Sequence, residues 1–281
     1  MSYSKIKSYA KINLALNIVG RVSSLHKIES IISFLDLHDE ISIKRIKNKN
    51  HKIKFIGQFS NYIGSNNTIS KLLEIVDKKK LLKNIKFEII IKKNIPQKAG
   101  LGGGSMNAAT ILKFLIKKKL IDTSKKEIYE ICSLIGSDVI LGIHSNNLIL
   151  KSNNTVKIFL LKNKTFILIV KPSFGCSTKE IYSKVKKFRK SRFNQPIKGM
   201  FNLSFLKKMN NDLELIALNK YPKLNTLKKF LEKLSNVDLV RMTGSGSAII
   251  AYFKSYKMCK EAEKKVKKQF RNYWCKTAKT I

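Results

Sequence analysis

Regular alternation of apolar and polar residues near the start of the chain predicts a β-strand. Residues 29–36 and 40–44 are also strand-like, and His38 and Asp39 between them are expected to form a turn. In the first strand one face is apolar and the other is mostly polar. The two faces carry Ile12, Leu14, Leu16 and Ile18, and Lys11, Asn13, Ala15 and Asn17, respectively.

Apolar residues at helical spacing and further strands follow along the rest of the chain. The helix over residues 125–135 is the clearest, because Ile128, Ile131 and Ile135 share one face and Gly136 follows its end. The remaining elements are predicted as a helix over 68–80, a strand over 85–92, a helix beginning near residue 105, a strand over 165–170, a helical region over 203–234, strands over 239–242 and 248–253 around a glycine turn, and a basic helix over 259–270.

Strands and helices mixed in two blocks predict an α+β protein with two domains, over residues 1–155 and 156–281. No uncharged apolar run approaches the ~18 residues that a membrane-spanning helix needs. The cysteines are far apart and form no C-x-x-C pair, so we expect a cytoplasmic protein with reduced thiols, no disulfide framework and no zinc site. These cysteines are Cys132, Cys176, Cys259 and Cys275.

The net charge of +39 raises the possibility of nucleic-acid binding. Most of that charge is lysine, which is poorer than arginine at forked recognition of phosphates and bases. The lysines are also scattered in short runs and form no single tail. This pattern favours solvated lysine faces over a nucleic-acid function, although the surplus charge would attract anionic substrates over long range.

A glycine-rich segment lies between the strand over 85–92 and the helix that follows it. Its glycines, Gly100, Gly102, Gly103 and Gly104, allow a tight backbone turn with inward-pointing N–H groups. The helix N-terminus adds unpaired amides and its dipole, and Ser105 can donate to a phosphate or help to position Mg²⁺. The spacing fits neither a Walker A motif nor the dinucleotide fingerprint. Its place between strand and helix favours phosphate binding over a flexible linker.

Asp138 and Lys11 are the candidate charged catalytic residues. Asp138 directly follows a helix end among apolar neighbours, where a carboxylate is either paired or poised to take a proton. A helix-capping role is an equally good interpretation of this position. Lys11 shares a strand face with Asn13, about 7 Å away by the two-residue repeat, and an ammonium near Asp138 would keep the carboxylate ionised. The alternative for Lys11 is a solvated strand lysine.

Together these motifs resemble the GHMP kinase superfamily, and within it the kinases that act on 4-diphosphocytidyl-2-C-methyl-D-erythritol. The resemblance runs nearly end to end. Residues 96–109 are similar to the phosphate loop of this family, and residues 136–139 to the segment that bears its catalytic aspartate. The other similar segments are residues 10–14, 34–41, 177–182, 211–214 and 243–248.

The resemblance implies an N-terminal ATP-binding domain and a C-terminal ferredoxin-like substrate domain, with the active site in the cleft between them. It implies ATP and Mg²⁺ as cofactors, Asp138 as the catalytic base and Lys11 as its charged partner. The ATP-binding residues would be Pro96, Gln97, Lys98, Ala99, Gly100, Leu101, Gly102, Gly103, Gly104, Ser105 and Met106.

The resemblance also implies the acceptor, which would be the 2-hydroxyl of diphosphocytidyl methylerythritol in the non-mevalonate route to isoprenoid precursors. Asn13, His26 and Tyr182 would bind this small molecule, with His26 and Tyr182 holding the cytosine. Neither nucleic acid nor a membrane is then expected as a partner, and the protein would be a monomer or a homodimer.

The chain departs from the family pattern before His26. The usual Asp-Gly-Tyr is replaced by Ser23-Ser24-Leu25, so one face of the cytosine would rest on Leu25 without aromatic stacking. Two alternatives stay open from the sequence. One is another GHMP kinase that acts on mevalonate, homoserine or a sugar, and the other is a basic nucleic-acid-binding protein.

Overall fold

A computed structural model describes residues 2–23, 25–161 and 164–281. The chain forms two compact units, each assembled from separate stretches of sequence. Unit 1 comprises Met1–Ala10, Leu37–Gln97 and Gly102–Ser145, and unit 2 comprises Lys11–Asp36, Lys98–Leu101 and Asn146–Ile281. The expected domain division at residue 155 stays a prediction.

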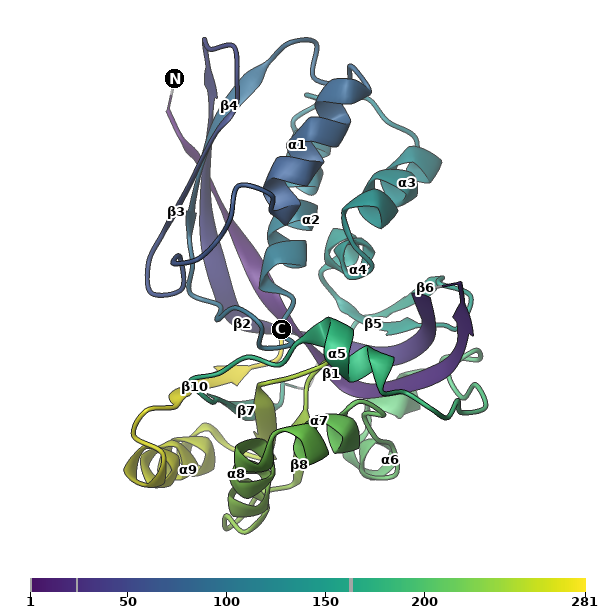
Figure 1. The fold of residues 1–281 in the computed structure, drawn as a ribbon, viewed down its shortest axis with the longest axis vertical. Helices are drawn as coiled ribbons and strands as arrows, with labels where there is room; N and C mark the ends of the chain where they lie inside the picture. The colour runs from purple at the N-terminus through teal and green to yellow at the C-terminus, as the bar shows by residue number, and fades with distance from the viewer. Residues whose placement is uncertain (1, 24, 162–163) are drawn as a thin grey trace. The chain divides into compact units, whose positions relative to one another are not determined.

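Unit 1 packs helices against a sheet (Figure 1). Strand β4 lies between the C-terminal half of β2, to which it is antiparallel, and β3, to which it is parallel. Alternate apolar residues of β2 and β4, such as Ile43 and Ile89, form a core with the buried faces of the helices, which include Leu72 and Leu112. The elements are β2 (Leu25–Ile46), β3 (Lys52–Ile56), α1 (Thr68–Lys78), β4 (Lys86–Lys92), α2 (Gly103–Lys117), α3 (Lys125–Ile135) and α4 (Val139–His144).

Unit 2 contains a four-stranded antiparallel sheet in the order β10-β7-β9-β8. Helices α8 and α9 pack on it through a core that includes Leu227 and Val266. The N-terminal half of β2 pairs with β5, and β5 pairs with β6. The elements are β1 (Ser4–Val22), β5 (Asn147–Leu150), β6 (Val156–Phe159), β7 (Phe166–Lys171), α5 (Thr178–Ser183), η1 (Lys198–Phe201), α6 (Leu203–Lys207), α7 (Glu214–Lys220), α8 (Pro222–Glu232), β8 (Leu239–Met242), β9 (Ile249–Phe253), α9 (Tyr256–Gln269) and β10 (Trp274–Lys279).

The structure confirms the α+β class and most of the predicted helices and strands. The turn expected at His38 and Asp39 is wrong, because β2 continues through both residues as one strand. Its ladder with β4 begins at the pair Glu40↔Lys92, directly after Asp39. The Asp39 side chain binds backbone amides beyond β4 and does not close a local turn. The short elements β3, β5, β6, β10, α4 and α5 were not predicted.

Each of the four cysteines is a buried free thiol, as expected. Burial raises the pKa of Cys132 and Cys176 to about 11, and that of Cys259 and Cys275 to about 12. These thiols stay protonated at neutral pH and are poor nucleophiles. Across the described part of the chain, no helix combines the length and the apolar character that crossing a bilayer requires.

Candidate active site

The N-terminus of α2 has no side-chain cap on its first amides. The helix begins at Gly103, two positions before the start expected near Ser105. Gly102 precedes it with a φ of 71°, no side chain caps its first amides, and no acidic residue lies in its first turn. Amides left without a side-chain cap, together with the helix dipole, favour a phosphate at this position. Ser105 lies in this first turn and is partly exposed.

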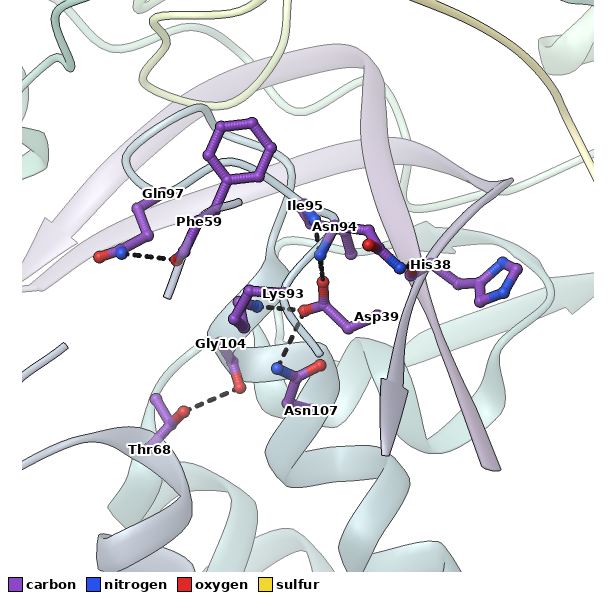
Figure 2. A network of polar contacts seen from close by, with 10 residues as sticks. All are labelled: His38, Asp39, Phe59, Thr68, Lys93, Asn94, Ile95, Gln97, Gly104 and Asn107. Carbon is purple, nitrogen blue, oxygen red and sulfur yellow. Dashed lines mark hydrogen bonds and ion pairs between the residues drawn. The ribbon is translucent and has the colours of Figure 1, made fainter. Parts of the chain in front are cut away.

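Asp39 holds the two ends of this loop in place (Figure 2). Its carboxylate is fully buried and accepts the backbone amides of Asn94, at 2.7 Å, and Ile95, at 2.8 Å, on one oxygen. The other oxygen accepts the side-chain amide of Asn107 at 3.0 Å and forms an ion pair with Lys93. Lys93 to Ile95 lead into the loop and Asn107 follows it in α2, so a single carboxylate fixes the loop at both ends.

Two further side chains brace the same loop in unit 1. The Thr68 hydroxyl donates to the carbonyl oxygen of Gly104 at 2.8 Å, which ties the start of α1 to the first turn of α2. The side-chain amide of Gln97 donates to the carbonyl oxygens of Phe59, at 2.9 Å, and Asn61, at 2.7 Å. Figure 2 shows the Gln97 side chain directed to the Phe59 carbonyl. Gln97 was predicted to bind ATP, and this contact indicates that its side chain supports the loop.

Asp138 lies immediately before the first residue of α4 and is partly buried. Its side chain makes no capping hydrogen bond to α4, so the structure does not support the helix-capping alternative. Helix α4 packs closely on α2, since an added Cβ at Gly142 would lie 2.6 Å from the Ala109 Cβ and 3.0 Å from the Met106 Sδ. Asp138 is four residues before Gly142, or about 6 Å along a helix axis. Gly142 therefore sets the approach of the segment that carries Asp138.

Lys11 and Asn13 form a buried polar pair on β1. Lys11 is only 3% exposed, which shows that the solvated-lysine alternative is wrong. Its ammonium donates to the Asn13 Oδ1 at 2.7 Å, and the Asn13 Nδ2 donates to the Ser30 hydroxyl at 2.8 Å. A buried lysine needs such hydrogen bonds, because burial without them would be costly. Both side chains are thus held in fixed positions.

Several motifs that lie far apart in the sequence meet in unit 2. The Thr243 hydroxyl accepts a hydrogen bond from the backbone amide of Asn13 at 3.0 Å and donates to the Gly100 carbonyl oxygen at 3.2 Å. The Lys11 amide donates to the Leu101 carbonyl oxygen at 3.0 Å. The side-chain amide of Asn211 donates to the carbonyl oxygen of Gly244 at 2.7 Å. The segments over 10–14, 98–101, 211–214 and 243–248 therefore form one backbone framework.

Gly100 is the position in this framework where no other residue fits. Its φ is 74°, a left-handed conformation that side chains disfavour. An added Cβ would lie 2.0 Å from the Thr243 carbonyl oxygen and 3.3 Å from the Gly246 amide nitrogen. The glycine is therefore required by the close approach of two backbones.

His26 and Tyr182, predicted to bind the substrate base, are neighbours in unit 2. Their ring centroids are 5.1 Å apart with an interplanar angle of 43°. Burial lowers the pKa of His26, and the charge of Arg21 lowers it further, so the neutral ring is favoured. Within the altered segment before His26, Leu25 is exposed, and Ser24 lies outside the described residues.

Comparison with known proteins identifies the family. The GHMP kinases N terminal domain matches residues 67–147, and the GHMP kinases C terminal domain matches residues 185–275. A 4-diphosphocytidyl-2-C-methyl-D-erythritol kinase from Pelagibacter ubique (strain HTCC1062) is 57% identical over 281 residues, which cover 100% of both chains. The chain belongs to the 4-diphosphocytidyl-2-C-methyl-D-erythritol kinase family of GHMP kinases. Membership in this kinase family implies the use of ATP.

Solved structures agree with this kinase fold. A crystal structure of 4-(cytidine 5'-diphospho)-2C-methyl-D-erythritol kinase has a TM-score of 0.77 at 20% identity, covering 98% of this chain and 99% of its own. A homoserine kinase from Cytophaga hutchinsonii has a TM-score of 0.69 at 16% identity, covering 100% and 97%. At such identities the likeness establishes the fold alone, and that fold serves more than one substrate.

The structure brings some of the predicted site residues of the kinase into contact. Asn13 and Lys11 are joined, as are His26 and Tyr182, whereas Lys11 belongs to unit 2 and Asp138 to unit 1. The pairing of Lys11 with Asp138 stays a prediction. Sequence reasoning missed the contribution of Asp39, because its partners lie far along the chain.

Proposed function

We propose that this protein transfers the γ-phosphoryl group of ATP to the 2-hydroxyl of 4-diphosphocytidyl-2-C-methyl-D-erythritol. The hydroxyl oxygen forms a bond to the γ-phosphorus, the bond from that phosphorus to the β–γ bridging oxygen breaks, and ADP leaves. The observation that carries this proposal is the 57% identity to a kinase of that name along the whole chain. The resemblance of the phosphate loop and of the segment around Asp138 supports it.

The loop over residues 96–106 binds the ATP phosphates through its backbone. The unpaired amides and the dipole at the start of α2 stabilise each nearby anionic group by about 0.3–1 kcal/mol. Because Asp39 and Thr68 already fix this loop, little ordering remains to be done when ATP binds. Positioning and electrostatics of this kind supply most of the catalysis in phosphoryl transfer.

Asp138 accepts the proton of the attacking hydroxyl as general base. Asp138 is partly buried directly before α4, and this helix packs on α2 through Gly142. Lys11 supplies a positive charge that is fixed by Asn13 and stabilises negative charge as it develops on the acceptor oxygen.

Magnesium is the metal that we expect to accompany ATP. Mg²⁺ takes oxygen ligands and is commonly held by substrate phosphates with few protein groups. The Ser105 hydroxyl, a hard oxygen donor in the first turn of α2, fits this chemistry. When bound, the ion would neutralise charge on the transferred phosphoryl group.

His26 and Tyr182 bind the cytosine, which distinguishes this substrate from the acceptors of other GHMP kinases. Mevalonate, homoserine and sugars carry no such base.

An assay of ADP release with the diphosphocytidyl substrate and with each of these other acceptors tests the substrate class. Turnover of the diphosphocytidyl substrate alone is expected. Equal turnover of an acceptor without the cytidine group would overturn the assignment, and RNA binding without any ATP turnover would favour the nucleic-acid alternative.

Paired substitutions test the two charged residues. Asp138→Asn is expected to lower kcat by ~10²–10⁴-fold with ATP binding largely retained. Asp122→Asn, an equivalent change at an exposed aspartate of unit 1, is the control. Lys11→Met should also lower kcat, whereas Lys7→Met at an exposed position of the same strand should not. Unchanged turnover in Asp138→Asn would remove Asp138 from the role of base.

A further inference from the structure

Phe188 is an aromatic side chain that the proposed chemistry does not yet use. Its ring centroid lies 6.4 Å from that of His26 at an interplanar angle of 55°. His26 also contacts Tyr182, so two aromatic rings lie beside this histidine in unit 2. Phe188 is 50% exposed, so its ring is accessible to a ligand.

Phe188 lies in a segment without helix or strand, yet the chain on its C-terminal side is firmly held. The Arg189 amide donates to the Ile18 carbonyl oxygen on β1 at 2.8 Å. The Arg189 guanidinium forms an ion pair of 2.5 Å with Asp212, whose other carboxylate oxygen accepts the Ile18 amide at 2.8 Å. The residue that follows Phe188 is therefore fixed to β1 by its backbone and by its side chain.

A second anchor holds residues 191–193, a few positions after Phe188, and it is the Glu29 carboxylate. This carboxylate is fully buried and accepts the Ser191 hydroxyl at 2.6 Å and the amides of Arg192, at 2.7 Å, and Phe193, at 3.0 Å. The side-chain amide of Asn17 donates to it as well, at 2.9 Å. A carboxylate with four donors is well satisfied despite its burial. The backbone on the C-terminal side of Phe188 is thus anchored at two carboxylates, those of Asp212 and Glu29.

The surroundings of Phe188 match one end of a nucleotide. Exposed cations flank it in the sequence, among them Lys186, Lys187 and Lys190. A planar base stacks favourably on an aromatic ring, and nearby cations favour the phosphates attached to such a base. Leu25, which is 74% exposed, offers only an aliphatic side chain on the His26 side. Phe188 provides the aromatic face that Leu25 lacks.

We propose that Phe188 stacks on the pyrimidine base of the substrate and is a specificity-determining residue of the base site formed with His26 and Tyr182. This inference rests on the proposed function, because the base belongs to the diphosphocytidyl acceptor. The framework around Glu29 and Asp212 presents the ring before the substrate arrives. Binding then requires no ordering of the segment.

Steady-state kinetics of two variants at one position test the proposal. Phe188→Leu keeps an apolar side chain and removes the ring, and the KM for the diphosphocytidyl substrate should rise about 5- to 100-fold while the KM for ATP is unchanged. Phe188→Trp keeps a stacking face and should restore the KM. Tyr256→Leu is the control, since it removes a half-exposed ring elsewhere in unit 2.

Direct binding of cytidine 5'-diphosphate, measured by calorimetry, separates this inference from the proposed function. If the unmodified enzyme fails to phosphorylate the diphosphocytidyl substrate, the proposed function is overturned, and weaker cytidine diphosphate binding by Phe188→Leu still supports the role of the ring. If the unmodified enzyme is active and Phe188→Leu keeps both its KM and its affinity for cytidine diphosphate within twofold, the role of Phe188 is overturned alone. An equal loss in Tyr256→Leu would also overturn it.

Discussion

Replacing Gly100 with alanine tests how strictly the phosphate loop depends on the backbone framework around it. The new Cβ would lie 2.0 Å from the Thr243 carbonyl oxygen, where real contacts essentially never fall below 3.0 Å. Neither atom is the end of a flexible side chain, since one is a Cβ and the other belongs to the backbone. The chain must therefore move by about 1 Å at the point where the residues over 98–101 meet the segment over 243–248.

Two costs follow from this change. A non-glycine residue in the left-handed region costs roughly 1–2 kcal/mol, and overpacking of this kind costs roughly 1–3 kcal/mol more. Catalysis is affected as well, because a misplacement of about 1 Å can lower the rate about 10²-fold. We therefore expect kcat/KM for ATP to fall about 10²-fold in Gly100→Ala, with a moderate loss of stability.

The assay is ADP release at varied ATP, accompanied by thermal unfolding to confirm that the variant is folded. Gly64→Ala is the matched control, because no atom lies within 4 Å of its added Cβ and its φ is ordinary. That variant should behave like the unmodified enzyme in both measurements. A folded Gly100→Ala variant whose kcat/KM for ATP stays within threefold of the unmodified value would refute the reasoning about the loop.

Two further predictions concern Asp39 and His26. Asp39→Asn leaves the Lys93 ammonium buried without its counter-charge, and urea unfolding should show a loss of about 3–5 kcal/mol. Glu40→Gln removes an ion pair with Lys92 in which both side chains are 51% exposed, and should cost less than about 1 kcal/mol; equal losses would contradict the role of burial. Because burial and Arg21 lower the pKa of His26 from 6.5, the KM for the diphosphocytidyl substrate should be constant above pH 6.5 and rise as the pH falls and the ring becomes protonated. In His26→Gln this rise should disappear, and its persistence would show that another group titrates.

The position of the glycine loop could be predicted from the sequence because the signal that marks it is local. A run of glycines between a strand and an apolar helix places the unpaired amides of that helix next to a flexible backbone. The structure confirms the position and moves the helix start from Ser105 to Gly103. By contrast, no local signal distinguishes Gly100 from Gly104, although an added Cβ meets backbone at 2.0 Å in one case and only a side chain at 3.3 Å in the other.

The turn expected at His38 and Asp39 failed for the opposite reason. Two polar residues between apolar segments usually mark a turn, since short polar side chains bind their own backbone. Here Asp39 binds backbone amides 55 and 56 positions further along the chain. Such partners become visible only when β2 and β4 are paired, so tertiary structure overrides the local preference. Phe188 was missed in the same way, because its neighbour His26 lies on a distant strand.

Buried carboxylates explain how a chain with a net charge of +39 orders segments that lie outside its helices and strands. Asp39 and Glu29 are each fully buried, and each accepts two consecutive backbone amides from a segment outside the helices and strands. A fixed negative charge therefore orders the backbone without using the amides at the start of α2, where no side chain caps the helix. In the proposed function this division leaves the helix N-terminus to the triphosphate. An acidic residue placed in the first turn of α2 would compete with the proposed ATP phosphates for those amides.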